Sequence, residues 1–261
     1  MEVLIQPNAT VAAALTARII AESLREKHDL VLGFATGRTM ERVYAQLVNL
    51  HQHEGLDFSS CRTFNLDEYV GLPATDPNSY RSYMNQHLFD HINIDVRNTY
   101  LPNGMAKDLK EECALYEKRI KACGGIDIQL LGIGESGHIG FNEPLSALYS
   151  RTRQKALTRV TIEQNSPLFD PPEKMPRRAL TMGVGTILEA NRIIMLVTGE
   201  KKAGILAKSV EGPITSMISA TALQTHPATT IITDEAAASQ LAHKDYYYWL
   251  WENEPEWENY R

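Results

Sequence analysis

The chain has 261 residues, an apolar fraction of 43% and a formal net charge of -6. This length allows one large domain or two small ones with a sizeable core, and the acidic balance argues against a protein that binds nucleic acid nonspecifically. No apolar run reaches the roughly 18 residues of a membrane span, and Met1–Pro7 lacks the features of a signal peptide. Cys61, Cys113 and Cys123 have no metal-ligand or C-x-x-C spacing, so we expect free thiols and a cytoplasmic protein.

Strands and helices are predicted to alternate along the chain. The first helix is expected from Asn8 or Thr10, either of which can cap it, to about Lys27. Short apolar runs then predict buried strands, and apolar residues at helical spacing predict helices. The expected strands are Leu30–Phe34, the run that ends at Arg62–Asn65, Ile126–Leu131, Asn191–Thr198 and Thr229–Thr233. The further expected helices are Met40 to about Leu50, Ser79 to about Phe89, 107–122 and one that opens at Gly199. This alternation predicts an α/β fold with a doubly wound, mostly parallel sheet flanked by helices.

A polar, proline-rich stretch of weak periodicity, residues 145–178, interrupts this pattern. We interpret it as a mobile lid of a single domain that spans residues 1–261, and not as a domain of its own. In doubly wound sheets, ligands bind beyond the carboxyl ends of the strands. Because several loops rich in glycine or acidic residues follow predicted strands, the pattern favours an enzyme.

The most informative of these loops is Gly132–Pro144. Its glycines allow positive φ angles and close approach of the backbone to a ligand, and His138 and Glu143 can move protons near neutral pH. The loop also spells G-x-G-x-x-G, but a dinucleotide site needs a helix that begins in the loop and an acidic residue about 20 positions further on. Both are absent here, so a nicotinamide cofactor is not expected. A tight turn without a ligand is the structural alternative.

Other loops carry groups that suit an anionic substrate. Thr36–Thr39 lies between a strand and a helix, where backbone N–H groups, hydroxyls and the Arg38 guanidinium can bind an anion. Lysines follow Gly199 at a helix start, which the helix dipole disfavours, and a phosphate site would explain them. Asp67 and Glu68 follow another strand, where one carboxylate can act as general base for a carbon acid. A solvated turn or charge pair is the alternative in each case.

Together these segments resemble the glucosamine-6-phosphate deaminase (isomerase) family. The resemblance extends from about residue 29 to 235, through motifs in the same order and spacing: Asn65–Leu72, Gly134–Pro144, Ser150–Arg153, Leu180–Thr186, Gly199–Ala203, Val210–Gly212 and Leu223–Pro227. It implies conversion of glucosamine 6-phosphate to fructose 6-phosphate and ammonia in amino-sugar catabolism, by aldose–ketose isomerisation and hydrolytic C–N cleavage. It implies no metal and no organic cofactor.

The resemblance also implies roles for individual side chains. His138 exchanges the proton of the ring oxygen as the pyranose opens, and Glu143 orients and charge-balances that imidazole. Asp67 takes the C2 proton of the open sugar and returns a proton at C1. Ser136 joins this catalytic group where the family often has Asp or Asn, so it supplies no charge. The implied substrate and phosphate contacts are Thr36, Gly37, Arg38, Thr39, Glu68, Gly137 and Lys202.

One departure from the family concerns arginine. Arg38 stands where the family usually has Gly or Ser, and the lid arginine that reaches the phosphate in the family aligns with Pro167. Relative to the family, this chain thus gains one arginine and loses another among the residues that would contact the phosphate. We hypothesise that Arg38 replaces the lid guanidinium, with a changed substrate as the rival explanation.

Regulation and assembly are left open by the sequence. Hexameric members of the family bind N-acetylglucosamine 6-phosphate at an interface site, which Ser146, Arg153 and Lys155 match, whereas Ala156 replaces a threonine. An allosteric site and a homo-oligomer are therefore expectations to test. The aromatic run Tyr246–Trp251 is consistent with a subunit contact or with a terminal helix packed on its own domain.

Three other functions remain as alternatives. Galactosamine 6-phosphate differs from the glucosamine ester by one hydroxyl orientation, which no identified residue reads. A sugar-phosphate isomerase or lactonase of the same superfamily is the nearest enzymatic alternative, and the segments Phe141–Pro144 and Asp67–Gly71 favour a deaminase over a lactonase. A sugar-phosphate sensor would need an N-terminal DNA-binding module, whereas the 28 or so residues before the first predicted strand read as one helix.

Overall fold

The computed structural model describes residues 1–261 and contains two β-sheets. In the larger sheet seven parallel strands run in the order β1-β10-β9-β6-β2-β3-β5. Their bounds are β1 Glu2–Gln6, β2 Val31–Phe34, β3 Arg62–Asn65, β5 Thr99–Tyr100, β6 Ile128–Leu131, β9 Arg192–Val197 and β10 Thr229–Asp234. The smaller, antiparallel sheet has the order β4-β8-β7, with β4 Asp67–Tyr69, β7 Arg153–Ala156 and β8 Arg178–Thr181. The predicted α/β fold with a mostly parallel sheet is confirmed.

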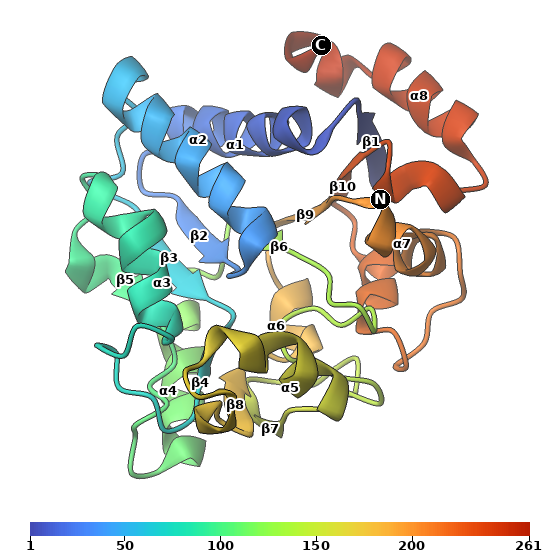
Figure 1. The fold of residues 1–261 in the computed structure, drawn as a ribbon. Coiled ribbons are helices and arrows are strands. Elements are labelled where there is room, and N and C mark those ends of the chain that lie inside the picture. The colour runs from blue at the N-terminus through green and yellow to red at the C-terminus, as the bar shows by residue number, and fades with distance from the viewer.

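Helices cover both faces of the larger sheet (Figure 1). The α-helices are α1 Ala9–Glu26, α2 Arg38–Glu54, α3 Tyr80–His87, α4 Leu109–Ala122, α5 Arg159–Asn165, α6 Val184–Leu188, α7 Ala203–Val210 and α8 Lys244–Asn253. On one face, Phe34 of β2 contacts Tyr44 of α2, with 5.4 Å between ring centroids. Phe64 of β3 pairs in register with Gly33, so it points to the opposite face. There Phe64 meets Tyr116 of α4, which places α2 and α4 on different sides of the sheet.

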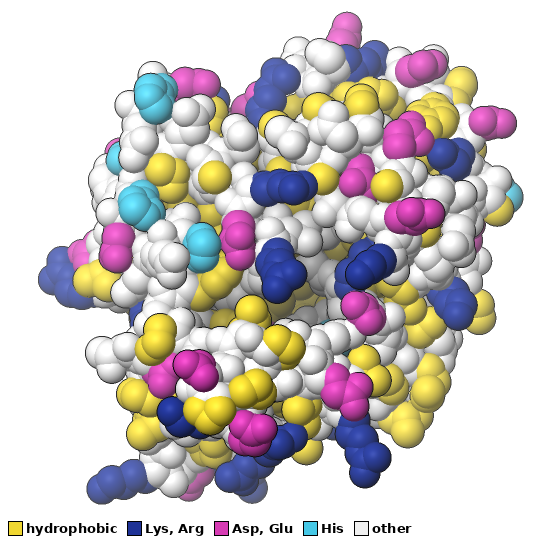
Figure 2. Space-filling view, in the orientation of Figure 1, with side chains coloured by type: hydrophobic (Ala, Val, Ile, Leu, Met, Phe, Trp, Pro, Cys, Tyr) yellow, Lys and Arg dark blue, Asp and Glu magenta, His cyan; other side chains and the backbone are white.

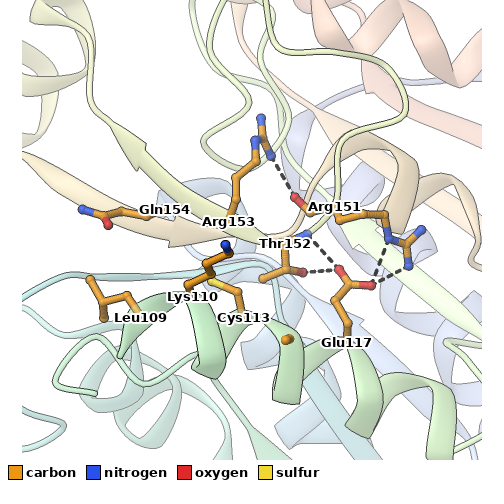
Figure 3. Close-up of a pocket in the computed structure, with 9 residues that line it drawn as sticks. Leu109, Lys110, Cys113, Glu117, Arg151, Thr152, Arg153 and Gln154 are labelled. Atoms are coloured by element: carbon orange, nitrogen blue, oxygen red, sulfur yellow. Dashed lines mark hydrogen bonds and ion pairs between the residues drawn. The ribbon is translucent and has the colours of Figure 1, made fainter. Parts of the chain in front are cut away.

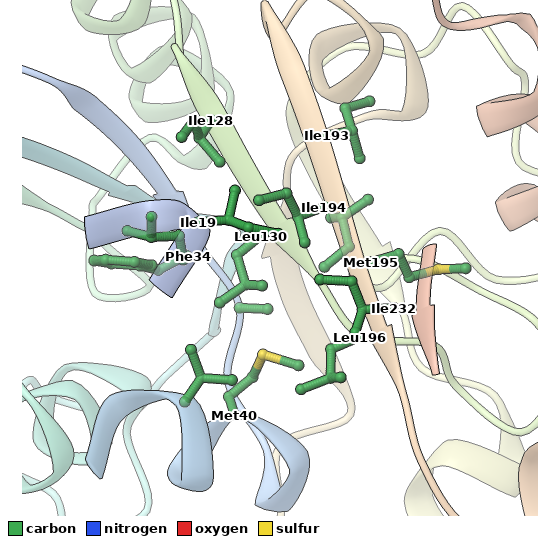
Figure 4. Packing of buried hydrophobic residues seen from close by; sticks show 14 of the residues in the cluster. Ile19, Phe34, Met40, Ile128, Leu130, Ile193, Ile194, Met195, Leu196 and Ile232 are labelled. Carbon is green, nitrogen blue, oxygen red and sulfur yellow. The ribbon is translucent and has the colours of Figure 1, made fainter. Parts of the chain in front are cut away.

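These contacts belong to one large apolar core of 56 buried residues. Figure 4 shows part of it, where side chains of α1 and α2 lie beside those of β2, β6 and β9. Strands of a parallel sheet are covered on both faces, so they read as nearly continuous apolar runs. This is why the strands at the centre of the sheet are recognisable in the sequence.

The N-terminal region differs from the expectation. The sequence predicts one helix before the first strand, but β1 precedes α1 and pairs with β10 at the edge of the sheet. α1 begins where predicted, because the Asn8 side-chain oxygen accepts hydrogen bonds from the amides of Thr10 and Val11, both at 3.0 Å. The strand has only five residues and adjoins a long helix. Its sequence is too short to show a periodicity that distinguishes it from that helix.

The small sheet forms a second layer with most of the 145–178 segment. The predicted loop after β3 begins with β4 instead, and β7 and α5 lie in the segment expected to be irregular. Their apolar side chains form a separate small core of Tyr69, Phe141, Leu157, Phe169, Met175 and Ala179. The 145–178 segment is therefore packed structure, anchored on residues from both β4 and the Gly132–Pro144 loop.

The aromatic C-terminal region packs on its own chain. α8 lies against β1 (Figure 1) and buries Tyr247 and Leu250, while Trp257, which follows it, is fully buried. Tyr246 and Trp249 stay exposed, with their rings stacked on each other. The buried residues of this region thus pack on the chain's own domain, as one of the two interpretations of the sequence expected. None of the helices in the molecule has the length and apolar character that a bilayer-spanning helix needs.

Candidate active site

The loops singled out in the sequence meet at one edge of the larger sheet. In the parallel order β9-β6-β2-β3 the carboxyl ends point the same way, so the segments that follow these strands are neighbours. They are 198–202, 132–144, 35–39 and 66–69. The winding of the sheet changes direction between β6 and β2, which is where such folds bind ligands. Figure 2 shows a hollow there, between the start of α2 and the 145–178 segment, with Lys and Arg side chains at its rim.

His138 is held at one ring nitrogen and free at the other. Its Nδ1 lies 2.7 Å from Ser136 Oγ and 3.3 Å from Glu143 Oε2, whereas no protein group hydrogen-bonds Nε2. The ring rests on Gly134, where an added Cβ would lie 2.2 Å from ring atoms. The glycine thus provides the space for the imidazole, and Nε2 is left to exchange a proton with a ligand.

Glu143 is a buried carboxylate, 3% exposed. It connects the Gly132–Pro144 loop, called the catalytic loop below, to α5. Its Oε1 accepts hydrogen bonds from the Thr158 amide at 3.4 Å, from Thr158 Oγ1 at 3.2 Å and from Thr161 Oγ1. Burial raises the pKa of Glu143, but the facing His138 imidazole and the hydrogen bond from Thr161 outweigh it, and the pKa falls to about 2. Glu143 is therefore an anion at neutral pH, suited to stabilise an imidazolium.

Asp67 in β4 is 6% exposed. Burial, followed by the charge of the adjacent Glu68, raises the pKa of Asp67 to about 8. The catalytic loop reaches it at Gly140, where φ is +55° and an added Cβ would lie 3.4 Å from Asp67 Oδ2 and 2.9 Å from Thr181 Oγ1. Bare backbone at Gly140 thus lets the loop approach the carboxylate. A base whose pKa lies near neutrality is well matched to proton transfer at carbon.

Glu68 is turned toward α3. Its Oε1 accepts hydrogen bonds from the amides of Tyr69 at 2.9 Å and Tyr80 at 3.0 Å, and its Oε2 from that of Arg81 at 3.0 Å. Burial raises the pKa of Glu68, and these backbone hydrogen bonds lower it. Both oxygens are used by backbone amides, so a role in holding the start of α3 fits this geometry better than the substrate contact implied by the resemblance.

An anion can bind where α2 begins. Gly37 precedes the helix with φ of +116° and no side chain caps it, so the first amides and the helix dipole face the hollow. Thr36 and Thr39 are half-buried at this turn, and Arg38 is exposed. Lys202, which follows β9, takes part in no ion pair. Burial lowers its pKa, which Glu135 partly offsets.

Of the residues that match the family's effector site, Arg153 and Lys155 lie on β7, whereas Ser146 follows the Gly132–Pro144 loop and its amide donates to the Glu143 carbonyl at 3.0 Å. Arg153 donates to Ser146 Oγ at 3.1 Å, and Lys155 shares a strand face with Arg153 because side chains alternate. A pocket of about 440 Å³ beside them is shown in Figure 3. In it Arg151 pairs with Glu117, whereas Arg153 has no carboxylate partner. The pocket is lined by Leu109, Lys110, Cys113, Ala114, Glu117, Arg151, Thr152, Arg153 and Gln154.

The structure also adds side chains that the sequence reading missed. Thr158 and Thr161 contact Glu143, and Thr158 caps α5 by accepting from the Thr161 amide. A threonine before a short polar helix is a capping signal that the expectation of an irregular lid obscured. No group of three or more His, Cys, Asp or Glu side chains is arranged to hold a metal ion.

Comparisons with known proteins identify the family of this chain. The family model for glucosamine-6-phosphate isomerases/6-phosphogluconolactonase matches residues 6–237. The glucosamine-6-phosphate deaminase of Shewanella woodyi is 48% identical over 247 residues, 95% of this chain and 94% of that protein. That of Streptomyces coelicolor is 45% identical over 259 residues, 99% of both chains.

Solved structures lead to the same result. One described as a monomeric glucosamine-6-phosphate deaminase of the NagB superfamily has a TM-score of 0.90 at 44% identity and covers 92% of this chain and 100% of that one. A 6-phosphogluconolactonase from Trypanosoma cruzi shares the fold at a TM-score of 0.73 and 20% identity, over 92% of this chain and 97% of that one. The resemblance inferred from the motifs is confirmed. The chain belongs to the family of glucosamine-6-phosphate isomerases and 6-phosphogluconolactonases.

Proposed function

We propose that this protein is a glucosamine-6-phosphate deaminase, which converts its substrate to fructose 6-phosphate and ammonia. The observation that carries the proposal is the meeting of two proton-transfer groups at one sheet edge. One is the buried base Asp67, and the other is His138 with its anionic partner Glu143. Hydrolysis of a lactone needs a base only to activate water, whereas aldose–ketose isomerisation needs a base that moves a proton between carbons. The names of the 43–48% identical relatives support the same reaction.

Ring opening is assigned to His138. Its Nε2 takes the proton of the C1 hydroxyl, and the imidazolium gives a proton to the ring oxygen as the bond between C1 and that oxygen breaks. Glu143 stabilises the imidazolium from the Nδ1 side. Ser136 Oγ accepts from the same Nδ1–H, so it orients the ring without adding charge.

Isomerisation and deamination are assigned to Asp67. Its carboxylate takes the C2 proton of the open aldose, which forms a C1–C2 enolamine, and a proton returned to C1 gives the C2 imine of fructose 6-phosphate. Water adds to C2 and ammonia leaves. The raised pKa of Asp67 makes it a stronger base than an exposed aspartate and helps it to return the proton.

The phosphate is assigned to the turn Thr36–Thr39, the start of α2 and Lys202. Gly137, whose φ is +80°, brings the backbone of the catalytic loop close to the substrate. The 145–178 segment acts as a lid, and Pro167 in it supplies no cation. Arg38 supplies the guanidinium instead. The Arg38→Ala variant should raise the Michaelis constant for the phosphorylated sugar, and an unchanged constant would contradict this assignment.

The whole chain works as one domain in the cytoplasm, where its three free cysteines stay reduced. A homo-oligomer stays a prediction, and sedimentation of the purified protein tests it. The exposed pair Tyr246 and Trp249 is the surface that we would expect at such a contact.

A second role is supported by the unpaired Arg153 and its contact with Ser146. We propose that these two residues and Lys155 bind an anionic effector, with N-acetylglucosamine 6-phosphate as the compound to test. A titration should then increase the rate of ammonia release at low substrate. A hyperbolic response that ignores the compound would contradict the effector site and leave the catalytic proposal intact.

The test of the main proposal is ammonia release from glucosamine 6-phosphate, with galactosamine 6-phosphate and unphosphorylated glucosamine alongside. Fast release from the first compound alone is the expected result. Release only from the galactosamine ester would keep the mechanism and change the substrate. No release from any of the three would overturn the proposal.

A further inference from the structure

We propose that Thr161 and Thr158 of the lid are positioning residues for ring opening, because they hold the catalytic Glu143 in place against His138. The inference rests on the proposed deaminase function and adds to it a link between the lid and the catalytic loop. Neither threonine touches the reacting atoms. Both act through the Glu143 carboxylate.

The contacts of Glu143 carry the inference. Every hydrogen bond that its carboxylate accepts comes from Thr158 or Thr161, and all of them end on Oε1. The Gly132–Pro144 loop, to which Glu143 belongs, donates none. The other oxygen, Oε2, lies 3.3 Å from His138 Nδ1. With Oε1 fixed by the first turn of α5, Oε2 is held on the imidazole.

The threonine hydroxyls also affect the charge of Glu143. A buried carboxylate without donors would favour its protonated form, as burial alone raises its pKa. Thr161, which is 2% exposed, donates to Glu143 from inside the protein, where a hydrogen bond to a charged group is strong. Without that donor, Glu143 would stabilise the imidazolium less and could turn away from it.

The same threonines belong to the lid. Leu157 and Phe169 flank α5 in sequence and pack in the small core with Tyr69 and Phe141, which adjoin the catalytic segments. A displacement of this packed unit would carry Thr158 and Thr161 away from Glu143. The packing of the lid on the small core and the positioning of Glu143 against His138 are therefore coupled.

The experiment compares Thr161→Val with Thr161→Ser. Valine keeps the shape and removes the hydroxyl, whereas serine keeps the hydroxyl. With glucosamine 6-phosphate, kcat of Thr161→Val should fall about 10- to 100-fold, the range of a weakened acid–base catalyst, while KM stays within about twofold. The serine variant should recover kcat to within about threefold of the wild-type protein.

A matched control removes a threonine hydroxyl that donates to a different carboxylate. Thr186 is 3% exposed and donates to Glu117 at 2.6 Å, so Thr186→Val imposes a similar loss of buried bonding away from the site. Its kcat should stay within about twofold of the wild type. Equal losses of kcat in Thr186→Val and Thr161→Val would assign the effect to general destabilisation and overturn the proposal.

A double-mutant cycle with Glu143→Gln tests whether Thr161 acts through Glu143. In that background Thr161→Val should change kcat less than twofold. A loss as large as in the wild-type background, or a wild-type kcat for Thr161→Val alone, would overturn the proposal. The proposed function fails separately, if the wild-type protein releases no ammonia. Differences between variants do not lead to that result, so the two failures can be told apart.

Discussion

At the scale of the residue, two buried carboxylates of the site are tuned in opposite directions. Asp67 accepts no hydrogen bond from the protein, so burial dominates and its pKa rises to about 8. Glu143 is hydrogen-bonded by threonines and faces His138, and its pKa falls to about 2. Environments that separate the pKa values of two carboxylates also separate their roles. Here they suit Asp67 to its proposed role as a base and Glu143 to its proposed role as a permanent anion.

Asp67→Asn should lose activity and gain stability at alkaline pH. The folded protein favours protonated Asp67, because its pKa is raised from the ordinary 3.8 to about 8. Its stabilising contribution is therefore complete below pH 4 or so and is lost as the pH rises through about 8. At pH 9 the free energy of unfolding of the variant should exceed that of the wild type by about 1–3 kcal/mol. The rate of ammonia release by the variant should be at least about 100-fold lower.

Urea denaturation of both proteins at pH 5 and pH 9 measures this difference. The wild type should lose stability relative to Asp67→Asn between the two pH values. A constant difference between the two proteins would show that Asp67 titrates at its ordinary value.

Gly134→Ala should impair catalysis without unfolding the protein. Its Cβ would lie 2.2 Å from ring atoms of His138, whereas in Gly132→Ala the Cβ would meet only Met40 Cε, at an ordinary 3.5 Å. We expect kcat to fall at least about tenfold in the first variant, because the imidazole must shift, and to change less than about twofold in the second. Steady-state ammonia release with a thermal melt of each variant checks this. Equal kcat values for the two would contradict the packing described for His138.

At the scale of the element, what the sequence predicts depends on whether a segment's signal is local. β6 and β9 are recognisable because their apolar runs follow from burial on both faces. The loop Gly132–Pro144 is recognisable because its glycines and titratable groups lie together in sequence. The strands β4 and β7 are short and polar, and they exist because β8 lies between them. Such nonlocal pairing leaves little trace in either partner's own sequence.

The same reasoning explains why some residues of the site are predictable and others are not. Asp67, His138 and Glu143 stand in sequence motifs, so the sequence alone is enough to predict them as candidates. Thr158 and Thr161 act only because the small sheet folds α5 back onto Glu143. Their contribution depends on tertiary packing that no local pattern encodes.

Phe169→Ala should loosen the lid as a unit. Phe169 is 5% exposed and packs edge to face on Tyr69, with 5.7 Å between ring centroids, so its truncation removes much of the small core. Amide hydrogen exchange in residues 157–176 should become faster, while the strands of the larger sheet keep their protection. Leu168→Ala is the control, because Leu168 is 57% exposed. Faster exchange throughout the molecule would show that the small core is not a separate unit.

At the scale of the whole molecule, the C-terminal region secures the edge of the sheet. Trp257 is fully buried, with Trp251, Tyr260 and the guanidinium of Arg192 around its ring. It belongs to the same large core as the central strands. The loops of the candidate site follow strands nearer the middle of the sheet, so we expect this region to affect stability more than chemistry.

Trp257→Ala should lower the free energy of unfolding by about 3–5 kcal/mol, the cost of truncating a buried aromatic residue. Met105→Ala, a substitution of an exposed residue (55%) far from α8 in the sequence, should change it by less than about 0.5 kcal/mol. Urea titrations measure both values, and kcat at a temperature where each variant is folded should match that of the wild type. A small effect of Trp257→Ala would mean that the C-terminal region is not part of the cooperative fold.

The pairing of β1 with β10 has a consequence for biosynthesis. Glu2–Gln6 is translated long before its partner Thr230–Asp234, because most of the residues of the sheet lie between them in the sequence. The nascent chain must therefore keep an apolar strand unpaired while the residues between β1 and β10 are made, and the growing sheet has an open edge meanwhile. Chains with such unpaired edges aggregate readily before they are complete. For this molecule, the speed of translation and access to chaperones should govern the yield of folded protein more than the stability of the finished sheet does.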